Sequence, residues 1–160
     1  MFSIYFKEIN AFFSSLIGYL VIGVFLVSIG LFMWVFSDTS VLDYNFATMD
    51  QLFSIAPLVF LFLIPAVTMR SFAEEKAKGT IEFLYTKPLT TFEIILGKYF
   101  ANFTLVIFAL LPTLVYYYSV YQLGSPVGNL DSGAIIGSYI GLFFLAGAFV
   151  AIGMLASTLT

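Results

Sequence analysis

Residues 11–36 read AFFSSLIGYLVIGVFLVSIGLFMWVF and contain no charged side chain. A helix of roughly 20 apolar residues is long enough to cross the hydrocarbon layer of a bilayer. A secretory signal peptide has a shorter apolar region, of about 7–15 residues, followed by a small-residue cleavage site. This stretch is longer and ends near the aromatic residues Trp34 and Phe36, so it predicts a membrane-spanning helix that is retained.

Three further segments have the same character, and none of them contains a charged side chain: 52–69, 99–121 and 133–157. Over all 160 residues, 61% are hydrophobic and 9% are charged, against about 45–50% and about 25% in typical soluble domains. So few charges cannot cover the surface of a soluble domain. The predicted fold class is therefore all-α: a polytopic membrane helix bundle with four spans, forming a single transmembrane domain over 1–160.

All six cations lie on one side of the predicted spans. Lys7 precedes the first span, and the others lie between the second and third spans, in segment 70–98: Arg70, Lys76, Lys78, Lys87 and Lys98. The other two linkers, 37–51 and 122–132, contain no Lys or Arg. Short cytosolic loops of membrane proteins carry the excess of Lys and Arg. We therefore predict that the N-terminus and segment 70–98 face the cytosol.

The N-terminal residues 1–10 have a helical pattern of their own. Apolar side chains recur at the i, i+3, i+4, i+7 spacing of one helix face: Phe2, Tyr5, Phe6 and Ile9. This pattern, which Ile4 interrupts, predicts an amphipathic helix in the membrane interface. The alternative is a frayed extension of the first span.

The cytosolic segment has the signals of three consecutive helices. A helix that continues from the second span is expected to stop at Gly79. Thr80 is predicted to be the N-cap of a short second helix, which Pro88 closes. Thr90 and Glu93 have the spacing of a capping box, which starts a third helix that leads into the third span.

The short helix would place apolar side chains in the cytosol. Ile81, Leu84 and Tyr85 line one predicted face, with Phe83 beside it. Exposed apolar surface of this kind usually marks a contact with a partner or with a membrane. The helix therefore either folds back onto the membrane surface or docks on a partner protein, and the pattern by itself favours neither.

Composition excludes several kinds of chemistry. The chain has no cysteine and no histidine, which removes disulfides and the usual zinc ligands, and no span contains a carboxylate for an intramembrane enzyme. The spans also lack the ionisable residues of ion-coupled carriers, and Gly97-Lys98 lacks the other residues of a P-loop. The net charge of -3 gives no reason to expect nucleic acid. We predict a protein that is not an enzyme, binds no cofactor or metal itself, and needs a separate motor for any transport.

The stretch between the second and third predicted spans resembles ABC-2-type permeases, the membrane subunits of ATP-binding-cassette exporters. The motifs that carry the resemblance are Ile64-Pro65-Ala66, Met69-Arg70-Ser71-Phe72-Ala73-Glu74-Glu75, Gly79-Thr80-Ile81-Glu82-Phe83-Leu84, Pro88 and Gly97-Lys98. The ending 151–160 is similar to the end of that family's fourth span. Within the family, the chain is similar to the permease subunit associated with bacterial gliding motility.

The resemblance implies a permease that moves a substrate with ATP bound by a separate cytosolic ATPase subunit, alongside a second permease subunit. It implies a multi-pass protein of the bacterial cytoplasmic (inner) membrane, with an elbow helix before the first of six spans. With four spans, this chain is expected to be a fragment. The alternative function is a non-transporting membrane scaffold that recruits a cytosolic ATPase complex.

The resemblance also implies that the short helix and its flanks form the coupling contact with the ATPase. The residues implied are Gly79, Thr80, Ile81, Glu82, Phe83, Leu84, Tyr85 and Pro88.

Glycines recur every four residues in the fourth predicted span, at Gly133, Gly137 and Gly141. Small residues at this spacing allow two helix backbones to approach closely in a membrane. They predict a helix-packing ridge, either within this chain or between two copies in a homodimer.

Overall fold

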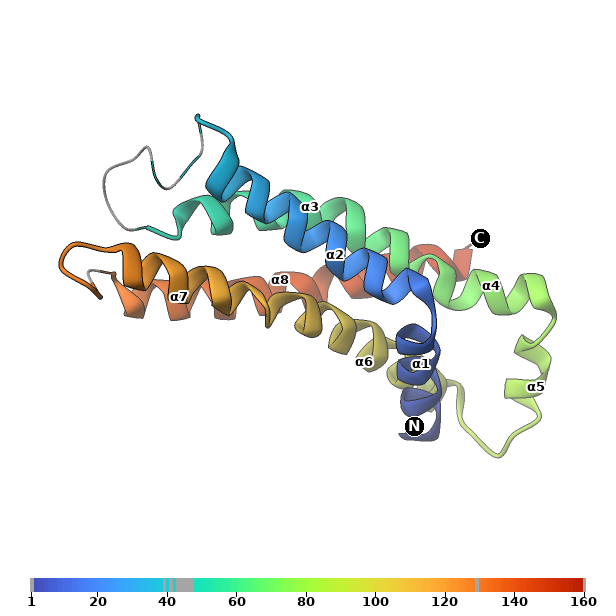
Figure 1. Ribbon diagram of the computed structural model, residues 1–160. Helices are drawn as coiled ribbons and strands as arrows, with labels where there is room; N and C mark the ends of the chain where they lie inside the picture. The colour runs from blue at the N-terminus through green and yellow to red at the C-terminus, as the bar shows by residue number, and fades with distance from the viewer. Residues whose placement is uncertain (1, 39, 41, 43–47, 129, 160) are drawn as a thin grey trace.

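The computed structural model describes residues 2–38, 40, 42, 48–128 and 130–159, and these residues form helices and no strands. The long helices run side by side in Figure 1. They are α2 (Leu16–Gly30) with the π-helix η1 (Leu31–Val35), α3 (Asp50–Thr68), α6 (Thr91–Leu110) with α7 (Thr113–Leu123), and α8 (Ser132–Leu159). Within the described ranges, four helical stretches are long and apolar enough to cross a membrane. The predicted all-α, polytopic architecture is confirmed.

The N-terminal helix α1 (Phe2–Ser14) lies across one end of the bundle and packs against α6 (Figure 1). It ends where the Ser14 hydroxyl donates to a carbonyl one turn earlier (2.6 Å) and Ser15 takes an extended backbone conformation. Such side-chain hydrogen bonds compete with the helical ones. The first span therefore begins at Leu16 rather than at residue 11, the N-terminal helix ends at Ser14 rather than at residue 10, and the frayed-extension alternative is wrong.

The bend after α1 requires a glycine. A Cβ added at Gly18 would collide with the carbonyl oxygen of Phe12, because the start of α2 passes directly over the end of α1. The sequence pattern does not reveal this close approach, since Gly18 lies inside a continuous apolar run.

The face that α1 turns toward the bundle differs from the predicted stripe. Phe2 and Phe6 are exposed, and Tyr5 is half-buried, with its hydroxyl 3.0 Å from that of Thr104. Ile4, which interrupts the predicted stripe, is the buried residue of α1. The stripe is therefore left largely on the outside, where apolar side chains suit a lipid environment.

Two glycines of α8 mark where helices pack tightly. A Cβ at Gly153 would collide with the hydroxyl of Thr68 on α3, and a Cβ at Gly147 would lie 3.1 Å from the hydroxyl of Tyr99 on α6. By contrast, Gly137 and Gly141 have no atom within 4 Å of an added Cβ. The prediction that these glycines pack within this chain is therefore wrong for the described residues.

Gly133, the third residue of the predicted ridge, approaches only the side chain of Asp131, at 3.6 Å, which is an ordinary contact. The physical reason for the error is the helix face. In the same half of α8, Ile135 and Leu142 are buried and Tyr139 contacts Phe53 of α3, whereas the three glycines lie on an exposed face. Contact with a second copy stays a prediction.

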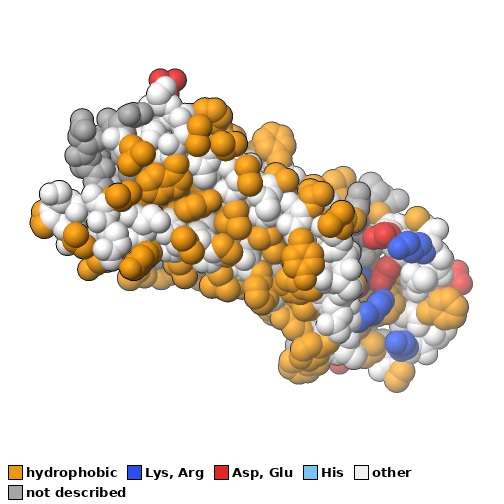
Figure 2. All heavy atoms as spheres, in the orientation of Figure 1, with side chains coloured by type: hydrophobic (Ala, Val, Ile, Leu, Met, Phe, Trp, Pro, Cys, Tyr) orange, Lys and Arg blue, Asp and Glu red, His pale blue; other side chains and the backbone are white. Residues whose placement is uncertain are grey.

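Beyond the bundle, α3 continues almost unbroken into α4 (Arg70–Lys78), because Met69 keeps helical dihedral angles (φ -58°, ψ -27°). The short helix α5 (Ile81–Tyr85) follows and leads back toward α6 (Figure 1). Most charged side chains visible in Figure 2 gather at this end, while hydrophobic side chains dominate the rest of the visible surface. We call it the charged end.

Candidate functional site

The turn between α4 and α5 forms as predicted. Gly79 has a left-handed backbone (φ 69°), which costs glycine little and other residues more. The backbone amide of Thr80 returns to the carbonyl of Glu75 (3.0 Å), which closes the end of α4. Thr80 occupies the N-cap position, but its hydroxyl donates to the same carbonyl (3.4 Å) and does not cap α5. The predicted capping bond of Thr80 is therefore wrong, because the left-handed turn directs this residue back toward α4.

The helix after α5 begins with the predicted capping box. The Thr90 hydroxyl accepts from the Glu93 amide (3.3 Å), and the Glu93 carboxylate accepts from the Thr90 amide (3.1 Å). These reciprocal bonds satisfy two amides that the first turn of α6 leaves free. Pro88, predicted to close the short helix, lies exposed in the connection before this box.

The apolar side chains of α5 divide into two groups. Leu84 is 4% exposed and joins the hydrophobic core, and Ile81 packs against that core. Phe83 and Tyr85 are 70% and 61% exposed. The predicted outward face of Ile81, Leu84 and Tyr85 is therefore wrong in two of its members: Ile81 and Leu84 hold α5 to the chain, whereas Phe83 and Tyr85, together with exposed Glu82, are available to a partner.

Where α4 lies against α1 and α6, four charged side chains form one cluster. Lys98 of α6 is completely buried, and its ammonium lies 2.8 Å from the Glu8 carboxylate and 3.1 Å from that of Glu75. Glu75 also pairs with Lys7 (3.1 Å). Two cations and two carboxylates sum to zero, so the group is neutral as a whole. We call Lys7, Glu8, Glu75 and Lys98 the charge cluster.

The buried ammonium of Lys98 has further contacts with α4. It donates to the carbonyl of Ser71 (2.9 Å) and lies 5.1 Å from the centre of the Phe72 ring. An ammonium has three donors and loses its hydration when buried, so it needs several such partners. Hydrogen bonds to Glu8 and to the Ser71 carbonyl satisfy two of the donors, the Glu75 carboxylate adds an ion pair at 3.1 Å without a hydrogen bond, and Phe72 adds a cation–π contact.

Ser157 of α8 holds the same helix from another side. Its hydroxyl donates to the Met69 carbonyl (2.7 Å) and accepts from the amides of Phe72 (3.0 Å) and Ala73 (3.3 Å). These backbone groups lie where α3 passes into α4, and Ser157 is fully buried. One serine therefore pairs three backbone groups at the α3–α4 junction and ties them to α8.

The charge cluster was not predicted from the sequence, since Lys7 served there as a signal of orientation, Lys98 as a signal of orientation and a motif residue, and neither was given an acidic partner. The sequence does contain one signal that Lys98 is buried and paired. Lys98 shares a helix face with Ile94, Ala101 and Leu105, which are all buried. A lysine on the apolar face of a helix requires an acidic partner. However, the sequence does not say that the partners are Glu8 and Glu75, at separations of 90 and 23 residues.

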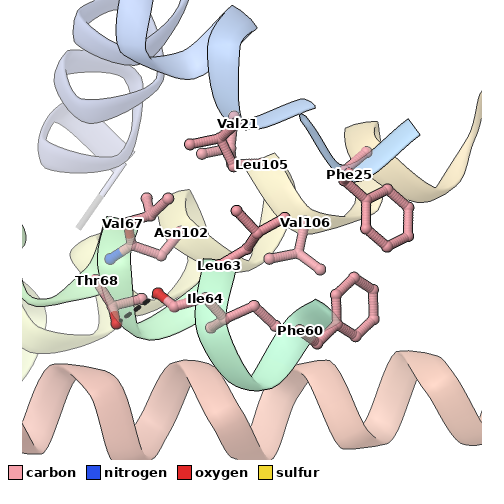
Figure 3. Close-up of a pocket in the computed structure, with 11 residues that line it drawn as sticks. Val21, Phe25, Phe60, Leu63, Ile64, Val67, Thr68, Asn102, Leu105 and Val106 are labelled. Carbon is pink, nitrogen blue, oxygen red and sulfur yellow. Dashed lines mark hydrogen bonds between the residues drawn. The ribbon is translucent and has the colours of Figure 1, made fainter. Parts of the chain in front are cut away.

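Figure 3 shows a small cavity between α2, α3 and α6. Its volume is about 20 Å³, and apart from Thr68 and Asn102 the lining is apolar. The Thr68 hydroxyl donates to the Ile64 carbonyl (2.9 Å; dashed in Figure 3), whereas the side-chain oxygen of Asn102 is buried without a hydrogen-bond partner among the described residues. A space of this size holds at most a water molecule, so it is not a substrate site.

Within the described part of the chain, no three His, Cys, Asp or Glu side chains converge on a point where a metal ion would bind. Two groups of side chains stand out in this region: the exposed aromatic pair of α5 and the charge cluster around α4. Neither has the arrangement of a catalytic site. The aromatic pair suits contact with a partner, and the charge cluster suits contact between helices.

Comparison with known proteins places most of these elements in one family. Residues 35–160 match the profile of a family described as ABC-2 family transporter protein. The match covers more than half of the chain and includes α3 to α8, whereas α1 and α2 precede it. No curated protein and no solved structure matches the chain.

Proposed function

Because the chain belongs to the ABC-2 family of transporter proteins, we propose that it is the permease of an ATP-driven exporter and that α5 is where a separate ATPase subunit drives it. Family membership and four apolar helices make the chain a multi-pass membrane component of a transport complex. The proposal adds the source of energy and the docking helix. ATP is bound by the partner, since this chain has no P-loop.

The observation that carries the proposal is the exposure of Phe83 and Tyr85 on a helix whose other apolar side chains are already covered. Aromatic side chains are enriched among the residues that contribute most to protein interfaces. The helix lies at the charged end of the molecule, where Lys and Glu side chains surround it (Figure 2). These surroundings support an aqueous protein partner rather than insertion into the membrane surface.

The test is the affinity of the purified ATPase subunit for the full-length permease in nanodiscs. Each buried aromatic anchor contributes about 2 kcal/mol or more, so Phe83→Ala should weaken binding about 30-fold, and Phe83→Ala with Tyr85→Ala more. Membrane insertion should be unchanged, because both side chains are exposed. Phe92→Ala is a matched control, since Phe92 is 69% exposed but lies on α6. Unchanged affinity in the double variant would refute docking on α5.

The proposal also includes the orientation: α1 and segment 70–98 in the cytosol of a bacterium, with this chain in the cytoplasmic membrane. The cations of the chain support it. A single cysteine is readily introduced, because the chain has none. A cysteine at Val127, which is 60% exposed, should react with an impermeant reagent in intact cells, whereas one at Lys76 should react only after lysis. The opposite pattern would reverse the orientation.

A second permease subunit and a role in gliding motility complete the proposal. Gly137 and Gly141 face no atom of the described chain, which supports contact with a second copy. Cysteines at Gly137 in two copies should form a disulfide across such a contact, and cysteines at Ile136, an exposed residue on a different face of the same helix, should not. The role in gliding motility is supported by sequence resemblance, and loss of surface spreading in a strain that lacks the permease tests it.

A further inference from the structure

Lys98 lies where three helices meet at the charged end. It contacts Glu8 of α1 and Ser71, Phe72 and Glu75 of α4, and it belongs to α6. We propose that Lys98 is the positioning residue of the coupling apparatus: the charge cluster fixes α4 to α1 and to the adjacent end of α6, so that these three helices move as one body when α5 is displaced. The source of that displacement rests on the proposed function.

The electrostatics of the cluster favour a rigid arrangement. A buried ammonium is strongly unfavourable unless carboxylates compensate its charge and hydrogen bonds satisfy its donors. Lys98 is completely buried, and the side chains of Glu8 and Glu75 are each only 13% exposed. If α1 or α4 moved away from Lys98, a buried charge would lose its partner. Separation of the three helices is therefore much less favourable than their joint movement.

The two carboxylates have different roles. Glu8 ties α1 to α6 through Lys98, whereas Glu75 lies between Lys98 and Lys7 and so joins α4 to both α6 and α1. A second ion pair on α4, Lys78–Glu74 at 2.8 Å, connects only residues of the same helix, and both of its side chains are more than half exposed. This pair is a natural control, because it has the same chemistry without linking helices.

The remaining contacts show where movement is possible. Ser157 holds the start of α4 to α8, so α4 is held from three directions. Its far end leads to Gly79, where an added Cβ would meet no atom within 4 Å. The backbone can therefore change conformation more readily at the Gly79 turn, which has space around it, than at the junction between α3 and α4. A displacement of α5 that exceeds the freedom of this turn passes through α4 into α1, α6 and α8.

The experiment measures the distance between α1 and α4 by pulsed electron paramagnetic resonance, in the full-length permease in nanodiscs with its ATPase subunit. Spin labels replace the exposed residues Ser3 and Ala77. The wild-type cluster should give one narrow distance that a non-hydrolysable ATP analogue does not change. Lys98→Met should broaden the distribution about twofold, because both carboxylates lose a buried cation. Lys78→Met should leave it narrow.

A charge-balanced variant protects the test against a failure of Lys98→Met to fold. Glu8→Gln combined with Lys98→Met removes one charge of each sign, leaves the Lys7–Glu75 pair, and avoids a net buried charge. It should insert normally and still give a broader distance than wild type, and restoring Lys98 alone should not restore the narrow distance. A narrow, unchanged distance in this double variant would overturn the proposal.

The breadth of the distance distribution without nucleotide depends only on the permease, so it reports on the cluster even if the ATPase docks elsewhere. Conversely, loss of ATPase affinity in Phe83→Ala reports on docking and leaves the Ser3–Ala77 distance narrow.

Discussion

Helices α4 and α5 are separated by only two residues, yet they are held in opposite ways. The polar contacts of α4 reach three other helices, through Lys98, Lys7 and Ser157. By contrast, α5 has five residues, and only Leu84 is fully buried. The connection between the second and third spans therefore contains both a rigid arm, α4, and a small exposed tip, α5. A rigid arm can transmit a force, and an exposed tip can receive it.

The largest effect on the arm is expected for Ser157→Ala. The substitution leaves the partly buried Met69 carbonyl and the buried Phe72 amide without their Ser157 partner, and each unpaired buried group costs about 1–3 kcal/mol. We expect the free energy of unfolding to fall by about 3 kcal/mol, seen as a lower midpoint of thermal unfolding in detergent. Thr158→Ala is the control, because the Thr158 hydroxyl is exposed and bonds only within its own helix (2.7 Å). Equal midpoints for the two variants would show that Ser157 does not clamp the arm.

The next effect concerns the tip. Leu84→Ala removes a side chain that is 4% exposed, and truncation of a buried leucine costs about 2–5 kcal/mol. Because α5 is a short surface element, we expect the lower end of that range and a local result: faster amide hydrogen exchange over residues 81–86. Phe83→Ala should leave this exchange unchanged. If Phe83→Ala accelerated exchange as much as Leu84→Ala, the division of α5 into anchored and exposed side chains would be wrong.

A smaller effect is expected at the turn that joins arm and tip. Gly79→Ala places a Cβ on a left-handed residue, which costs about 1 kcal/mol of strain but causes no collision. Hydrogen exchange of α5 should increase slightly, and that of α4 should not change. Gly79→Asn should cost less, since asparagine tolerates this backbone region. An equal response in α4 and α5 would indicate that the turn does not separate two differently held elements.

The smallest effect is expected for Glu74→Gln, and the adjacent Glu75→Gln serves as its comparison. Glu74→Gln breaks an exposed i,i+4 pair, which contributes about 0.5 kcal/mol or less. Glu75→Gln, one residue further on, weakens two ion pairs around a buried lysine and should lower the thermal midpoint clearly more. If the two midpoints agreed within error, the charge cluster would be no more important than an ordinary surface pair.

Much of the architecture could be predicted from the sequence alone. Long apolar runs free of charge have few alternatives to a membrane-spanning helix. The stop at Gly79 and the capping box of Thr90 with Glu93 were also predictable, because each depends on residues within one turn of the chain. The predicted start of the first span, residue 11, is too early, because Ser14 and Ser15 look like ordinary residues of an apolar run. In the structure their hydroxyls bond to nearby carbonyls, and α1 ends there.

The candidate site shows the limit of such reasoning. Phe83 and Leu84 are neighbours with similar chemistry, and the pattern assigned Leu84 to the exposed face. The structure buries Leu84 instead, since the path of the chain after Gly79 turns that side of α5 toward the bundle. On α8, likewise, regular spacing favoured Gly137 and Gly141, whereas the tight contacts are at Gly147 and Gly153.

The sequence by itself determined that this is a membrane protein, how many apolar spans the described chain contains, and where the helices between the second and third spans start and stop. These properties depend on composition and on hydrogen bonds between residues a few positions apart. Only the tertiary structure decided that Lys98 meets Glu8 and Glu75 and that Ser157 holds the start of α4. The partners are 23 to 90 residues apart, and the packing of four helices brings them together; no local pattern contains that information.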